Sequence, residues 1–587
     1  FMTALLPRPE HPRPDFMRPN WINLNGEWQF SYDDDDRGLN EKWYRPGKTL
    51  DRTITVPFCY QCEWSGVNEQ EYHPILWYRR SFEKPNFTTG HRILLRFGAV
   101  DFSCAVYVNG QCVGTHKGGY TPFAFDITPY LLDDKNDLCL RVEDACDCTQ
   151  PRGKQMWTDK WFSCWYTPTS GIWQSVYLEE AGSIYVKTAH ITPDIDKGTA
   201  EVRITLNEIP ASPLNVKVTV TLDGQPVRTQ TMTMNQRSQR MVLDMVEGAV
   251  LHQLVRWTPA NPKLYDVHIE TDTGDDVTTY FGMRKVHVAD GRVLLNNKPI
   301  YQRLVLDQGY WPQTLITPPS DEAIRADVEW TLKLGYNGAR KHQKLEDPRY
   351  YYWADKLGLL VWEEIPSAYE YTDEAVANTS ETLTGGIERD FNHPSVITWV
   401  PVNESWGMDR LYANKQMQAS ANMLYYQVKA LDGTRVVSTN DGWECVQSDI
   451  FGLHDYAATG EVLAKHFADR DEMTMHACDH RMAYCDSKEW TGKEAFLLTE
   501  YGGIAFEDKN SGSWGYHDKV SGEEAFFERY QSVTDAARAI PYCQGYVYTQ
   551  LTDVQQEKNG ILTPERKPKV DVNHFRELTR NPDGRYQ

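Results

Sequence analysis

From about Asp290 onward, short apolar runs alternate with segments of helical periodicity, and this alternation restricts the fold more than any other feature. Apolar runs of four to eight residues begin near Tyr301, Tyr336, Leu359, Val396, Arg435, Asp449, Ala495 and Gly545. The runs are continuous, which predicts strands that are buried on both faces and joined by crossover helices. Eight such units predict a (β/α)8 TIM barrel over residues 289–587.

Before that point the chain shows short alternating strands separated by turns, without a helical period of useful length. Asn109-Gly110 separates two such strands and predicts a hairpin, because both residues tolerate positive φ. We expect a jelly-roll β-sandwich over residues 1–181 and an immunoglobulin-like β-sandwich over residues 182–288. The predicted fold class is therefore a multidomain β and α/β protein.

Composition and charge exclude several functions. A formal net charge of −21 argues against a nucleic-acid partner, which would require a basic surface. No apolar run approaches the ~18 residues of a membrane helix, and the start lacks a signal-peptide pattern. Twelve irregularly spaced cysteines indicate free thiols in a reducing, cytoplasmic compartment. Cys59 and Cys62 have zinc or redox spacing without a second matching pair, so we expect no metal and no cofactor.

Barrel proteins carry their functional side chains at the carboxyl ends of the strands. Polar residues at these predicted ends include Asp307, Arg340, Lys341, His342, Glu363, Glu364, Asn403, Glu404, Asn440, Asp441, His454, Tyr456, Glu500 and Tyr548. Glu404 and Glu500 follow buried strands in different units of the barrel. Cleavage of a glycosidic bond requires one protonated and one ionised carboxyl group, so this pair indicates glycoside hydrolysis.

Two alternatives compete with this interpretation. Each glutamate can instead be a solvated residue at a strand end. Glu363 and Glu364 are rival acids at the third strand end, but adjacent side chains on a strand point to opposite faces, so at most one enters the site. We expect these two acids to orient Arg340 or a sugar hydroxyl.

The stretch "NHPSVITWVPVNESWG" at residues 392–407 closely resembles the acid/base signature of glycoside hydrolase family 2, and "LLTEYGG" at residues 497–503 resembles its nucleophile strand. "RPNWINLNGEWQF" and "TSGIWQSVYLE" resemble the sugar-binding jelly roll of that family, so the resemblance covers nearly the whole chain. It implies an exo-acting retaining β-glycosidase that acts on a carbohydrate substrate. Glu404 would be the general acid/base and Glu500 the nucleophile.

The resemblance also implies supporting roles in the site. Asn403 would bind the sugar 2-hydroxyl, Tyr456 would hydrogen-bond the nucleophile, and Trp165 would reach the pocket from the jelly roll. Further substrate contacts are expected from strand ends and aromatic side chains at Asp307, Arg340, Lys341, His342, Trp406, Tyr501 and Tyr548. The family's magnesium site is assigned to no residue here.

Two departures from the family concern specificity. The glucuronidase Asn-x-Lys motif is replaced by Glu557, Lys558 and Asn559, and cations gather at the second strand end, where Arg340 and Lys341 stand. A cation cluster suits a substrate carboxylate, which predicts a β-galacturonidase. The alternative is that Arg340 pairs with Glu363 or Glu364, which leaves a neutral β-galactosidase as the default.

Further alternatives remain open on the sequence alone. A β-glucuronidase or a furanosidase of the same family fits the two glutamates equally well. A non-catalytic carbohydrate-binding protein would be expected to lack one of them. The sequence is compatible with homo-oligomerisation through the sandwich domains.

Overall fold

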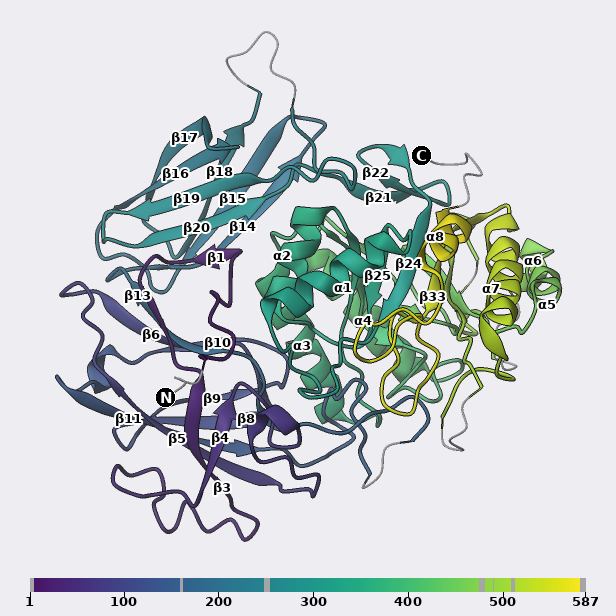
Figure 1. Ribbon diagram of the computed structural model, residues 1–587. Coiled ribbons are helices and arrows are strands. Elements are labelled where there is room, and N and C mark those ends of the chain that lie inside the picture. The colour runs from purple at the N-terminus through teal and green to yellow at the C-terminus, as the bar shows by residue number, and fades with distance from the viewer. Residues whose placement is uncertain are drawn as a thin grey trace.

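The computed structural model describes residues 5–158, 162–246, 254–474, 481–488, 490–507 and 513–580. Figure 1 shows two β-sandwiches lying on one side of a barrel of strands and helices. The predicted jelly roll, immunoglobulin-like sandwich and C-terminal barrel are confirmed. Among the helices of the described ranges, none combines the length and apolar composition needed to cross a membrane.

The first sandwich packs two antiparallel sheets around one apolar core. The larger sheet has the order β4 (Arg52–Val56), β3 (Gly26–Tyr32), β5 (Ile75–Glu83), β11 (Lys135–Glu143), β8 (Ser103–Val108), β9 (Gln111–Lys117). The smaller has the order β10 (Phe123–Asp126), β6 (Arg92–Phe97), β13 (Val176–Ala181), β2 (Trp21–Asn23), and β7 (Val100–Asp101) pairs with β12 (Gly171–Ile172). Alternate residues of β8, including Val106 and Val108, face this core, as a half-buried strand requires.

The second sandwich has a five-stranded and a three-stranded sheet. The first has the order β1 (Phe16–Met17), β20 (Asp276–Phe281), β19 (Tyr265–Thr271), β16 (Leu214–Leu222), β17 (Gln225–Met234), and the second the order β14 (Val186–Asp194), β15 (Thr199–Leu206), β18 (Ser238–Asp244). Strand β1 belongs to the segment expected in the jelly roll, yet Phe16 pairs with Thr279 of β20. The N-terminal segment therefore joins the two sandwiches.

Eight parallel strands form a nearly closed barrel, as predicted. Their order is β29 (Val436–Val437), β27 (Val396–Val400), β26 (Leu360–Glu364), β25 (Gly338–Lys341), β24 (Gln302–Asp307), β33 (Cys543–Thr549), β32 (Ala495–Gly502), β31 (Ile450–His454). The two end strands approach each other where the Asp449 N–H donates to the Val437 carbonyl at 3.0 Å. Beyond β27, the short strand β28 (Val402–Asn403) pairs with β30 (Asn440–Asp441).

Helices cover the outside of the barrel (Figure 1). They are α1 (Asp321–Lys333), α2 (Pro348–Leu357), α3 (Asp373–Asp390), α4 (Lys415–Leu431), α5 (Gly460–His466), α6 (Arg470–Met473), α7 (Gly522–Ala539) and α8 (Val572–Arg580), and short 3-10 turns lie at η1 (Glu63–Ser65) and η2 (Thr128–Tyr130). The side chains of Ser320, Asp347 and Thr372 accept backbone N–H bonds at the starts of α1, α2 and α3. Such caps satisfy N–H groups that have no partner inside the helix.

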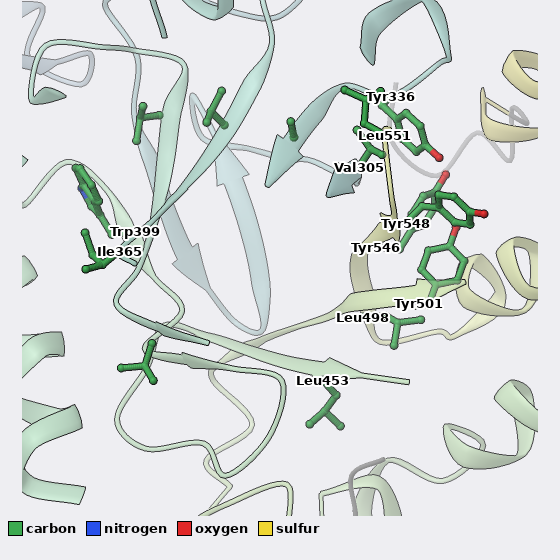
Figure 2. Packing of buried hydrophobic residues seen from close by; sticks show 14 of the residues in the cluster. Val305, Tyr336, Ile365, Trp399, Leu453, Leu498, Tyr501, Tyr546, Tyr548 and Leu551 are labelled. Carbon is green, nitrogen blue, oxygen red and sulfur yellow. The ribbon is translucent and has the colours of Figure 1, made fainter. Parts of the chain in front are cut away.

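Two apolar layers position the polar mouth of the barrel. Inside, Leu304, Leu360 and Trp362 pack with residues of a small antiparallel sheet, β21 (Val286–Ala289), β22 (Arg292–Leu295) and β23 (Lys298–Pro299). Outside, tyrosines and aliphatic side chains fill the space between strands and helices; Figure 2 shows them around Tyr501 and Tyr548. Polar groups inside the barrel are thus concentrated toward the carboxyl ends of the strands.

A buried carboxylate joins the second sandwich to the barrel. Asp355 of α2 has no exposed surface, and its Oδ2 lies 2.6 Å from His393 Nδ1 and accepts a 2.6 Å bond from the Tyr280 hydroxyl of β20. Its Oδ1 accepts the Ser395 N–H at 2.9 Å. This contact explains the residues of "NHPS" that precede β27: they fix the start of the strand that leads to Glu404.

We expect Asp355→Ala to lower the free energy of unfolding by about 3 kcal/mol, because it leaves a buried imidazole and an N–H group without their acceptor. Urea denaturation followed by tryptophan fluorescence measures the loss. Asp409→Ala removes an exposed carboxylate of the barrel and serves as the control. Equal denaturation midpoints for the two variants would contradict the assigned role.

Candidate active site

Glu404 follows β28 and lies in an unusual backbone conformation. Its φ is 52° and that of Ser405 is 56°, in the left-handed region that side chains other than glycine rarely occupy. The turn is held by the Glu404 N–H, which donates to the Asp441 carbonyl at 2.8 Å, and by the Ser405 N–H, which donates to Asn440 Oδ1 at 3.0 Å. Backbone strain of this kind is concentrated at functional sites.

A β-bulge aims Glu500 at the barrel interior. Leu498 of β32 pairs with Tyr546 of β33 and Tyr501 pairs with Tyr548, so β32 has one more residue than its partner between these pairs. The strand on the other side shows the same shift, since Leu453 pairs with Leu498 and His454 with Glu500. The extra residue keeps Tyr501 on the outer face while Glu500 turns inward.

The two carboxylates meet at one imidazole. His454 Nδ1 lies 2.9 Å from Glu404 Oε1 and 3.4 Å from Glu500 Oε2. One ligand atom from each of the three residues lies within 4.8 Å of the others. Gly442 leaves room for this contact: its φ is +118°, and a Cβ there would lie 2.9 Å from His454 Nδ1 and 3.1 Å from Glu404 Cγ.

Arg340 of β25 lies beneath this pair without any exposure to solvent. Its Nη1 lies 3.1 Å from Glu500 Oε1 and 2.8 Å from Asp441 Oδ2, and its Nη2 donates to Asn403 Oδ1. Its Nε donates to Glu364. Arg340 therefore positions the surrounding side chains, and all three nitrogens of its guanidinium are engaged by protein groups.

The charges of the site are set by burial and by these contacts. Burial lowers the pKa of His454, but the Glu500 charge and the hydrogen bonds to Asp441 and Glu404 outweigh it and raise this pKa to about 10. Burial raises the pKa of Glu404, yet the His454 hydrogen bond brings it below the usual value. Burial and the neighbouring Glu404 charge raise the pKa of Glu500, against the opposing charges of His454 and Arg340.

The cluster of Glu404, His454 and Glu500 also has the composition of a metal site. At neutral pH the imidazole of His454 carries two protons, because its pKa is raised to about 10. A protonated imidazole has no lone pair for a metal ion. The chemistry of the donor set therefore favours a hydrogen-bonding role for these three residues.

Tyr456 follows β31 and donates its hydroxyl hydrogen bond to Glu500 Oε2. Its ring stacks on Tyr516 at a centroid distance of 3.4 Å and an interplanar angle of 2°. Together with Arg340 and His454, Tyr456 places three potential donors around the Glu500 carboxylate. These donors favour its ionised form and fix its orientation.

The predicted substrate residues at the first two strand ends form internal contacts. Lys341 Nζ lies 3.1 Å from both Asp307 Oδ2 and Glu346 Oε2, and all three residues are buried. His342 Nδ1 lies 2.8 Å from Glu364 Oε1, and burial together with the Arg340 charge holds the pKa of His342 well below its usual range. A neutral His342 that donates from Nδ1 leaves Nε2 as a hydrogen-bond acceptor.

The rival acids of the third strand separate as the pleat requires. Glu364 points inward to Arg340, whereas Glu363 lies 3.6 Å from Arg389 of α3 on the outer face.

The direction of the side chains along the strands also corrects two predicted substrate contacts. Tyr501 bonds Thr534 of α7 at 2.9 Å, and Tyr548 packs edge-on against Tyr530 of α7 at 5.0 Å, so both lie outside the barrel wall (Figure 2).

Aromatic side chains from the jelly roll and the barrel meet at the mouth. Trp165 contacts Trp406 edge-on at 4.9 Å and donates from Nε1 to the Tyr369 hydroxyl at 2.8 Å. Gln556 Nε2 donates to the Trp165 carbonyl at 2.7 Å, which fixes the loop from the other side. The jelly-roll loop therefore forms part of the site.

Several residues of the site were not selected from the sequence. His454 and Asp441 stood among the polar strand ends, which was the available signal, but nothing distinguished them from their neighbours. Lys154 and Tyr369 come from loops outside the barrel strands, and only the tertiary structure brings them to the mouth. Glu557 was noted only as a departure from a motif; its carboxylate accepts hydrogen bonds from Tyr166 and Asn559.

Fold and site together define a barrel protein with two accessory sandwiches and paired carboxylates at its mouth. Three family models match in succession: "Glycosyl hydrolases family 2, sugar binding domain" at residues 22–181, "Glycosyl hydrolases family 2" at residues 184–284, and "Glycosyl hydrolases family 2, TIM barrel domain" at residues 286–581. The chain belongs to glycosyl hydrolases family 2, which confirms the resemblance seen in the sequence.

The relatives differ in the sugar for which they are named. A beta-galactosidase of Thermoanaerobacter pseudethanolicus is 28% identical over 400 residues, covering 66% of this chain and 52% of that protein. The chain spans about half the length of the curated relatives that it matches. A beta-glucuronidase structure from an uncultured Clostridium sp. has a TM-score of 0.76 at 21% identity, covering 97% of this chain and 98% of that one.

A beta-galacturonidase of Eisenbergiella tayi, solved with bound galacturonate, has a TM-score of 0.73 at 19% identity and covers 97% of this chain and 99% of that one. At these identities, the two solved structures establish a shared fold alone.

The raised pKa of His454 predicts a pH-dependent stability. Its folded pKa of about 10 exceeds the usual 6.5, so the bound proton stabilises the fold fully below pH 6.5, and this contribution declines as the pH rises to about 10. We expect the difference in unfolding free energy between the unsubstituted protein and His454→Gln to shrink across this interval. Urea denaturation at a series of pH values measures it; a constant difference would contradict the assignment.

Proposed function

We propose that the chain is an exo-acting retaining β-glycosidase in which Glu500 is the nucleophile and Glu404 the general acid/base. The observation that carries this proposal is a short distance: one carboxylate oxygen of Glu404 lies within 4.8 Å of one carboxylate oxygen of Glu500. Retaining glycosidases hold their carboxyl groups about 5–5.5 Å apart, whereas inverting enzymes need about 6.5–9.5 Å to accommodate a water molecule. An approach of two carboxylate oxygens to within 4.8 Å is consistent with the shorter separation of the retaining enzymes.

The reaction would proceed in two displacements. Glu500 attacks the anomeric carbon while Glu404 protonates the departing glycosidic oxygen, giving a covalent glycosyl-enzyme and the free alcohol. Glu404 then takes a proton from a water molecule as the oxygen of that water attacks the anomeric carbon. The bond to Glu500 breaks, which releases the β-sugar and regenerates the Glu500 carboxylate. Arg340, Tyr456 and His454 would stabilise the Glu500 carboxylate as it leaves the sugar.

The assignment gives Glu404 two protonation states during each turnover. In the free enzyme the His454 hydrogen bond holds the pKa of Glu404 below its usual range. A sugar between the carboxylates would remove water from Glu404 and weaken that contact, and both changes raise its pKa toward that of an acid catalyst. Once Glu500 is esterified, its charge is gone, which lowers the pKa of Glu404 again for the second step.

Asn403 is proposed to bind the sugar 2-hydroxyl. Its Oδ1 accepts a hydrogen bond from Arg340, which orients the amide and leaves Nδ2 available as a donor. His342 Nε2 is an available acceptor nearby. Trp165 and Trp406 would close the pocket around one sugar ring, consistent with removal of a single terminal residue.

The identity of the sugar that is removed is a separate question from the catalytic roles. A β-hexuronide of galacto configuration remains the specificity that we propose, with neutral β-galactoside, β-glucuronide and furanoside as alternatives. The names of the relatives include galactosidases, glucuronidases and a galacturonidase. The Arg340 and Lys341 cluster, which first indicated a hexuronide, is paired with protein carboxylates.

Variants of the two glutamates test the catalytic roles. We expect Glu404→Ala to reduce turnover of 4-nitrophenyl β-glycosides by about 10²–10⁴-fold and Glu500→Ala to reduce it further, because the first loses proton transfer and the second loses the covalent step. Azide should restore both: it would give a β-glycosyl azide with Glu404→Ala and an α-glycosyl azide with Glu500→Ala, which NMR distinguishes.

Glu370→Gln, which alters an exposed carboxylate near the mouth, is the matched control and should keep full activity. The proposal fails if either alanine variant retains the activity of this control. It also fails if the first sugar released by the unsubstituted enzyme, followed by NMR, is the α-anomer.

A further inference from the structure

Lys154 is brought to the barrel mouth by the jelly-roll segment between β11 and β12. The N–H groups of Arg152 and Gly153 donate to the Ser367 carbonyl of the barrel at 2.9 and 3.0 Å. The Lys154 carbonyl accepts the Tyr166 N–H at 2.8 Å. These bonds on both sides fix Lys154 between the two domains, close to the loop that follows β26.

The ammonium group of Lys154 is enclosed by site residues. The residue is 6% exposed, and its Nζ lies 5.3 Å from the ring centroid of Trp165 and 5.9 Å from that of Tyr166. Glu404 and His342 both lie near enough for the Lys154 charge to shift their pKa values. The cation therefore lies within electrostatic range of the predicted acid/base.

Lys154 differs from the other buried cations of the site in its partners. Arg340, Lys341 and Lys344 each form ion pairs with buried carboxylates. In the part of the chain that the structure describes, no carboxylate oxygen comes within the 4.0 Å of an ion pair with Lys154.

The acidic neighbours of Lys154 do not neutralise it directly. Glu557 acts on it through space while accepting hydrogen bonds from Tyr166 and Asn559. Burial lowers the pKa of Lys154, but Cys164, Glu557, Tyr369 and Glu404 outweigh it and hold this pKa above its usual value. The side chain is thus a charged, largely desolvated cation that forms no ion pair with any residue the structure describes.

We propose that Lys154 binds the carboxylate of a β-hexuronide and is the residue that determines specificity for uronides. The assignment rests on the glycosidase function proposed above. Lys154 forms no ion pair among the described residues, and a substrate carboxylate could accept a charge-assisted hydrogen bond from its ammonium group in a site from which water is excluded. The cations first predicted for this task are already neutralised by Asp307, Glu346, Glu364 and Asp441.

In the segment that replaces the glucuronidase motif, neither Glu557 nor Asn559 provides a positive charge. Asn559 donates to Glu557, and its Oδ1 accepts from Gln550 at 2.7 Å, so its amide is engaged on both sides. Glu557, a carboxylate, occupies the first position of the motif with which the family's glucuronidases bind the carboxylate of the sugar. Lys154 supplies a positive charge on the opposite loop, from the jelly roll.

The test compares three 4-nitrophenyl substrates, the β-D-galacturonide, the β-D-glucuronide and the β-D-galactoside, with purified full-length variants. We expect Lys154→Met to lower kcat/KM for the preferred hexuronide by about 10- to 100-fold, mainly through KM, because a charge-assisted contact is lost. Turnover of the galactoside should change much less. Calorimetry should show that galacturonate or glucuronate binds the unsubstituted enzyme and not the variant.

Lys117→Met is the matched control. Lys117 also joins the jelly roll to the barrel, through Glu374 at 3.1 Å, but 44% of its side chain is exposed. Thermal unfolding of each variant verifies that the fold is retained. Lys341→Met tests the cation that was predicted from the sequence.

Four results would overturn the role of Lys154 while leaving the glycosidase intact. They are turnover of the neutral galactoside alone, equal hexuronide kinetics in Lys154→Met and Lys117→Met, an equal loss on all substrates in Lys154→Met, and a selective loss in Lys341→Met instead. Absence of turnover on every β-glycoside by the unsubstituted enzyme would overturn the proposed function itself, and with it this inference.

Discussion

The buried guanidinium of Arg340 joins the carboxyl ends of most of the strands that form the site. It contacts Glu364 of β26, Asn403 of β28, Asp441 of β30 and Glu500 of β32. Three carboxylates in a space without water would repel one another strongly without this cation and the protonated His454. The same contacts orient the amide that is proposed to bind the sugar and the carboxylate that is proposed to attack it. Structure and chemistry at the mouth therefore depend on one network.

Much of the architecture could be predicted because buried parallel strands leave a strong sequence signal. Continuous apolar runs such as Val396–Val400 can be satisfied only by burial on both faces, and all eight runs became strands of the barrel. Glu404 and Glu500 could be selected because each follows such a run. The boundary near residue 181 was less informative, since β1 is only two residues long and pairs with a sheet far along the chain.

The rest of the site could not be predicted because it depends on which charges meet in space. The sequence around Lys341 does not show whether its ammonium group contacts a substrate or pairs with Asp307. Only the three-dimensional structure distinguishes these two possibilities. Tyr501 and Tyr548 follow strand residues that do face the interior, and a bulge together with the pleat places them against α7. Lys154 lies about 250 residues before Glu404 in the chain, in a loop whose position is set by bonds to Ser367.

The bulge in β32 makes strand pairing, and not side-chain identity alone, a determinant of this site. If the same residues paired regularly from Leu498 onward, Glu500 would point to the outer face and Tyr501 to the interior. A substitution at position 500 alters the carboxyl group but keeps its direction, whereas regular pairing keeps the group and loses its direction. A redesign that regularises the strand at constant length would therefore remove the carboxylate from the site without changing the identity of any residue.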